Sequence, residues 1–155
     1  NSNPYSLIVN KKVYDYAFGG LEQWLHTGVT TIDVSDADSM RVSLMNLQGI
    51  TAINTSGNWL VGDYELENNF SDLALELERI EIVEVLKTDE FPLTTFHGAT
   101  IEIWSNSDID PVILKFSRSH DDSKYLCMIE GVTVEVDSQI LTTLRTLYSM
   151  AGLWN

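Results

Sequence analysis

An alternation of apolar and polar residues dominates the chain from Val29 to Val136 and constrains its fold more than any other feature. Successive side chains of a β-strand point to opposite faces of a sheet, so a period of two is typical of strands with one buried face. Turn-forming sequences interrupt the alternation, among them Gly57-Asn58 and the connector Ser119–Ser123. The pattern therefore predicts at least six strands, mostly joined as antiparallel hairpins. The expected strands are 29–34, 40–47, 50–54, 59–67, 73–85, 99–105, 112–117, 124–130 and 132–136.

Leucines and glutamates alternate at the start of the segment 73–85. A strand would place Glu76 and Glu78 on one face and the leucines on the other, whereas a helix would spread the glutamates around its surface. We therefore predict a strand over 73–85, preceded by a hairpin loop at 67–72. The alternation reverses at Ile82-Val83, which indicates a β-bulge at that point.

Helical spacing of apolar residues flanks the strand-rich region on both sides. It predicts one helix over 14–26 and another over 138–150, for which Asp137-Ser138 supplies the N-terminal cap and Gly152 the stop. No linker rich in proline, glycine or serine divides the chain, so residues 1–155 are expected to form a single domain. The predicted fold class is α+β: a predominantly antiparallel curved sheet or partial barrel with an N-terminal and a C-terminal helix.

The charge balance excludes several classes of partner. The chain has 23 acidic and 9 basic residues, which gives a net charge of −14. Nucleic acid and anionic membrane surfaces attract basic proteins, so neither is an expected partner. No apolar stretch is long enough to cross a membrane. Between Arg41 and Arg79 the chain has acidic residues and no base, which indicates either a surface kept acidic for solubility or a docking face for a basic protein.

Residues with catalytic or metal-binding chemistry are few. Cys127 is the one cysteine and has apolar neighbours, so we expect a buried, unreactive thiol and neither a disulfide nor a cysteine-based zinc site. The three histidines, His26, His97 and His120, lack the spacing of a metal-binding pair on one helix. No glycine-rich phosphate-binding motif is present. We therefore expect no cofactor, no metal and no enzymatic activity.

Aromatic residues lie close in sequence to the acids. Tryptophan and tyrosine among charged residues are typical of protein-binding hot spots, so this composition favours a binding surface. The predicted partner-binding residues are Trp59, Asp63, Tyr64, Glu65 and Glu67 in one segment, and Trp104, Asp108 and Asp110 in another.

In its overall profile the chain resembles the bacterial immunity proteins, including those of contact-dependent growth inhibition. The resemblance rests on the compact acidic α+β pattern and on segments such as Trp59–Glu67 and Asp108-Ile-Asp110. It implies a cytoplasmic inhibitor that binds a cognate basic toxin, often a nuclease, without catalysis. The single cysteine and the lack of a visible secretory signal also favour the cytoplasm.

Three alternatives stay open at this point. The chain could be an acidic adaptor or assembly subunit that binds a basic protein. It could be a small hydrolase that uses His97 or His120, or a ligand carrier with an aromatic-lined interior.

Overall fold

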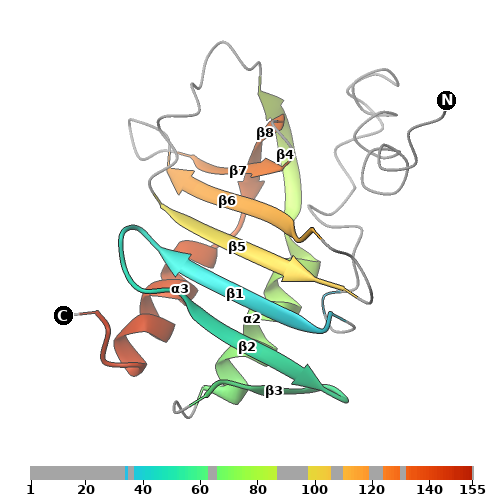
Figure 1. Cartoon of the computed structure of the whole chain (residues 1–155). Helices are drawn as coiled ribbons and strands as arrows, with labels where there is room; N and C mark the ends of the chain where they lie inside the picture. Colours follow the sequence, from blue (N-terminus) through green and yellow to red (C-terminus); the bar gives the residue numbers. More distant parts are fainter. Residues whose placement is uncertain are drawn as a thin grey trace, which may run out of the picture.

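The computed structural model describes residue 34 and residues 37–62, 66–86, 98–105, 110–118, 124–129 and 132–154, with only the backbone of Glu67 and Val85. Eight strands and two helices occupy this part of the chain (Figure 1). In chain order they are β1 (Ser39–Leu44), β2 (Ile50–Thr55), β3 (Asn58–Leu60), α2 (Glu67–Arg79), β4 (Glu81–Leu86), β5 (Ala99–Trp104), β6 (Val112–Arg118), β7 (Tyr125–Ile129), β8 (Val132–Asp137) and α3 (Ile140–Met150).

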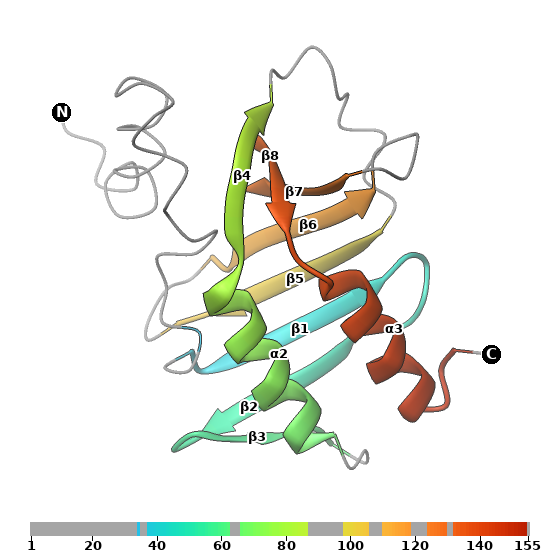
Figure 2. The same cartoon turned by 180° about the vertical axis from the view of Figure 1, so that it is seen from behind.

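All eight strands form one antiparallel sheet in the order β3-β2-β1-β5-β6-β7-β8-β4. The sheet is open, because β3 and β4 lie at its two edges rather than beside each other. The strand direction rotates steadily across the sheet, as the natural twist of strands requires (Figure 1). Helix α2 connects the two edge strands, and α2 and α3 lie side by side on one face (Figure 2). This architecture confirms an antiparallel α+β fold with a curved sheet.

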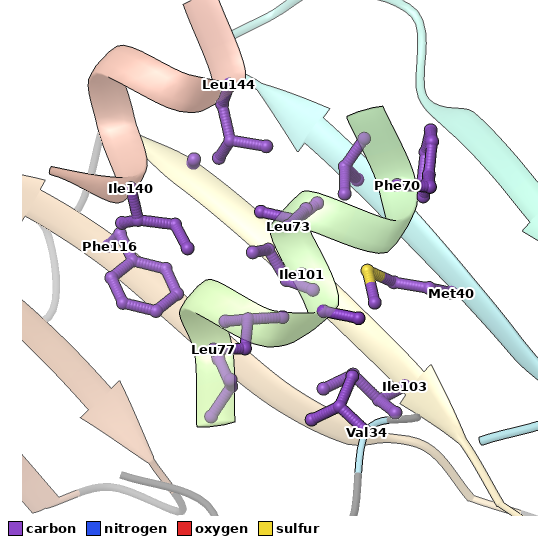
Figure 3. Packing of buried hydrophobic residues seen from close by; sticks show 14 of the residues in the cluster. Val34, Met40, Phe70, Leu73, Leu77, Ile101, Ile103, Phe116, Ile140 and Leu144 are labelled. Carbon is purple, nitrogen blue, oxygen red and sulfur yellow. The ribbon is translucent and has the colours of Figure 1, made fainter. Parts of the chain in front are cut away.

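The core lies between the sheet and the two helices. Every second residue of the central strands points toward the helices and is buried, for example Met40, Ile101 and Ile103. Leu73 of α2 and Leu144 of α3 meet these strand residues from the other side (Figure 3). The period of two in the sequence thus separates a buried face from an opposite face, which we call the outer face.

Helix α2 corrects the interpretation of residues 67–79, for which the sequence predicted a hairpin loop and the start of a strand. Phe70, Leu73 and Leu77 are spaced three and four apart, so they lie on one helical face, and all three are fully buried. Leu75, which a strand would place beside Leu73 and Leu77, is 42% exposed. The predicted strand is correct only for β4, where the register shift between Ile82 and Glu84 confirms the bulge.

The C-terminal helix is present as α3, which begins two residues later than predicted and has Gln139 as its N-cap residue. The side chain of Gln139 makes no capping bond, and the Ile140 N–H donates to Oγ of the preceding residue Ser138 at 3.0 Å. At the other end Gly152 adopts a φ of 68°, and the Leu153 N–H donates to the Tyr148 carbonyl at 2.9 Å. This is the glycine-terminated ending expected from the sequence. The predicted helix at 14–26 and most of the predicted strand at 29–34 lie outside the described residues.

The other expected strands agree with the structure within a few residues, except that β3 is much shorter than the predicted strand at 59–67. The turn before β3 has positive φ angles at Ser56 (55°) and Gly57 (88°), one residue earlier than predicted. Two successive positive φ angles are typical of the tightest hairpin turns.

Candidate protein-binding surface

The structure describes only part of the predicted binding site. Trp59, Trp104 and Asp110 are described in full, and the backbone of Glu67 begins helix α2. The remaining predicted residues lie outside the described residues: Asp63, Tyr64, Glu65 and Asp108.

Trp59 is a core residue rather than a surface anchor. Its side chain is 2% exposed, and its ring lies 6.3 Å from the ring of Phe70 between centroids. On β3 it faces α2, so it has almost no surface to offer a partner. The alternation along β3 gives the outward position to the next residue, Leu60, which is 51% exposed.

Half of the sheet has an outer face that no helix of the described part of the chain covers. Figure 1 views the molecule from this side, with β3, β2, β1 and β5 in front of both helices. Side chains of this face that are exposed or half-buried include Arg41, Thr51, Ile53, Leu60 and Trp104.

The strand register brings three large apolar residues of this face onto one line. Leu60 pairs with Ile53, Ile53 pairs with Ser39, and Ser39 pairs with Trp104. Ile53 is 57% exposed, Leu60 is 51% exposed and Trp104 is half-buried. Three strand spacings separate Leu60 from Trp104, which is roughly 14 Å. We call Leu60, Ile53 and Trp104 the apolar row.

Charged residues adjoin the apolar row. Asp38 is exposed, and its backbone N–H donates to the Trp104 carbonyl at 2.8 Å. Asp110, also exposed, leads into β6, which pairs with the strand that ends at Trp104. Two residues further along the strands, Arg41 Nε lies 3.9 Å from Glu102 Oε2. Because this pair is largely solvated, it contributes at most about 1 kcal/mol of stability.

The opposite end of the sheet is strongly acidic. Glu84 pairs with Glu135 across β4 and β8, and Glu81 pairs with Asp137. Carboxylates that face each other across strands repel, so these pairs destabilise the sheet unless a cation lies between them. Lys124 is that cation for the first pair: Nζ contacts Glu135 and lies 3.6 Å from Glu84 Oε2. The hydrogen bond to Glu135, together with the attraction of both carboxylates, raises the pKa of Lys124.

The described residues offer little that supports chemistry. Within them, no group of three histidine, cysteine or acidic residues could hold a metal ion. Burial raises the pKa of the Cys127 thiol, and the side chain has no exposed surface. A hollow beside the β1–β2 loop has a volume of about 90 Å³ and is lined by Gln48, Gly49, Ile50, Thr51, Val61, Gly62 and Leu153, none of which titrates. The three histidines lie outside the described residues.

The described helices are too short or too polar to span a membrane. Comparisons of the chain with protein-family models, with curated proteins and with solved structures give no match.

Sequence reasoning missed Ile53, Leu60 and Asp38. The alternation contained a signal for Leu60, because a buried Trp59 turns its neighbour outward. No local signal could join Leu60 to Trp104, because their alignment depends on the order and register of four strands.

Proposed function

We propose that this protein is a non-enzymatic binding domain that neutralises a cognate basic toxin domain, in the manner of the bacterial immunity proteins. The observation that carries the proposal is the net charge of −14, which is far from balanced along the chain. A field of this size and sign attracts basic proteins and speeds their association.

The positions of the described carboxylates support this proposal. Six of them are on exposed residues: Asp38, Asp72, Glu81, Glu84, Asp110 and Asp137. They occur on β4, β8, α2 and two loops, and five basic residues of the described chain are exposed as well: Arg41, Arg79, Lys115, Arg118 and Arg145. Repulsion among these groups costs stability, and a basic partner would convert that cost into binding free energy.

The surface available for contact also supports binding. The apolar row runs from the edge strand β3 to Trp104 on β5, and the acidic residues Asp38 and Asp110 lie beside it at the starts of β1 and β6. Protein interfaces combine apolar residues at the centre with polar residues at the rim, and this arrangement has both.

Co-expression with the product of the neighbouring gene tests the proposal. If that product is a toxin, cells that express it alone stop growing, and cells that also express this protein keep growing. The purified pair should form a stoichiometric complex that persists in size-exclusion chromatography. A complex without protection of growth would favour the acidic adaptor instead. If the pair forms no complex and growth is not protected, the acidic surface serves solubility alone.

A further inference from the structure

We infer that the apolar row, Leu60, Ile53 and Trp104, is the centre of the contact with a partner that carries its own apolar patch within a basic rim. This inference rests on the proposed function and assigns the contact to one face of the sheet.

Among the residues that the structure describes, Leu60 and Ile53 are exposed apolar neighbours, and Ser39 separates this pair from the half-buried Trp104. Leu60 and Ile53 are direct cross-strand partners, so their Cβ atoms are about 5 Å apart. Ile113 of β6, which is 40% exposed, continues the patch diagonally from Trp104, because its own partner is Glu102. The other large exposed apolar residues of the described chain lie on separate elements: Met45, Leu75, Val83 and Met150.

The two edges of the sheet differ in a way that favours a covered surface at β3. At β4, Glu81, Glu84 and a bulge protect the edge, and such features are the usual defence against unwanted pairing. At β3, no charged residue occupies the strand, and Leu60 is more than half exposed. The short length of β3 limits strand pairing, but adjoining exposed apolar residues still promote aggregation unless a partner covers them.

Charge decides which partner fits. Two copies of this chain would each bring a net charge of −14, so self-association through this face would have to overcome strong repulsion. Pairing of two β3 strands would also join only three residues from each copy. A basic protein meets Asp38 and Asp110 with complementary charge and can bury the row at the same time.

The test compares three lysine variants in their binding to the product of the neighbouring gene. Ile53→Lys and Leu60→Lys place a cation in the row, and Met45→Lys is the matched control. Met45 and Ile53 are both 57% exposed, and Met45 follows β1 at the end away from Ser39 and the row. All three variants change the net charge equally, so a difference between them reports contact rather than the overall field. Thermal unfolding of each variant confirms that the fold is retained.

We expect Ile53→Lys and Leu60→Lys to raise the Kd by roughly 30-fold or more, as for hot-spot residues, and Met45→Lys by less than about 3-fold. If the wild type binds tightly and all three variants lose affinity equally, the inference is wrong while the proposed function stands. If the wild-type protein does not bind, both fail. If light scattering shows a wild-type dimer that Ile53→Lys dissociates, the row binds a second copy, and the inference is again overturned.

Discussion

Replacing Tyr148 with phenylalanine should destabilise the protein by about 2 kcal/mol. The Tyr148 ring is fully buried, and its hydroxyl joins helix α3 to the loop between β1 and β2. Tyr148 Oη accepts from the Leu44 N–H at 3.3 Å, and it has the carbonyls of Gln48 at 2.8 Å and Val42 at 3.0 Å within donating reach. Burial raises the pKa of Tyr148, so the hydroxyl stays protonated and can donate at neutral pH.

The magnitude follows from the groups that lose a partner. Each net hydrogen bond contributes about 0.5–1.5 kcal/mol, and a buried N–H without an acceptor costs about 1–3 kcal/mol. For a chain of this length, about 2 kcal/mol corresponds to a fall in Tm of roughly 4–8 °C.

Tyr125→Phe is the matched control for the loss of one hydroxyl. The Tyr125 hydroxyl accepts from Arg118, whose side chain is exposed, and the Arg118 guanidinium would keep its place over the ring. This variant should change the free energy of unfolding by less than about 0.5 kcal/mol. Urea unfolding gives the free energy of unfolding of each variant, and the same m value is used for both. If Tyr148→Phe costs no more than Tyr125→Phe, the hydroxyl does not anchor the loop, and the reasoning is refuted.

Three further predictions test the fold. Leu77→Ala should cost about 2–5 kcal/mol and Leu75→Ala less than about 1 kcal/mol in urea unfolding, whereas equal losses would favour a strand over the helix. A Cβ at Gly98 would lie 2.2 Å from a carbonyl oxygen of β6, so Gly98→Ala should cost well over the roughly 1 kcal/mol expected for Gly57→Ala, where nothing lies within 4 Å. Cys127 should react with a thiol reagent only at the rate of global unfolding; rapid labelling of the native protein at pH 8 would contradict its burial.

Most of the sheet could be predicted because each strand carries its own signal. One buried face imposes a period of two, and Gly57 marks a turn by its chemistry, although the turn lies at Ser56-Gly57 rather than at Gly57-Asn58. The C-terminal helix was equally predictable, because the apolar spacing of its buried face and its stop at Gly152 are local features.

Helix α2 could not be recognised by the same rule. Its leucines at 73, 75 and 77 fit a strand, and the helical face becomes visible only when Leu66 and Phe70 are included. Phe70 falls in the predicted hairpin loop, so that prediction leaves out the first turns of the helical face. The period of two and the period of 3.6 compete in such a segment, and packing against β3 and α3 selects the helix.

The candidate site shows a related limit. The sequence predicted Trp59 as an apolar contact of β3, but Trp59 is buried and the exposed residue of that strand is Leu60. Which of two neighbours faces the core depends on the packing of α2 against β3, and this is a tertiary contact.

The salt dependence of association tests most directly whether the acidic surface exists to bind a basic protein. The measurement is the association rate constant of this protein with the product of the neighbouring gene, followed from about 20 mM to about 300 mM salt, a range over which the Debye length falls from roughly 20 Å to below 10 Å. If the charge of −14 attracts the partner, the association rate constant falls at least about tenfold over this range while the dissociation rate constant changes little. An association rate constant that does not change with salt would contradict the account, because the acidic surface would then have no part in recognition.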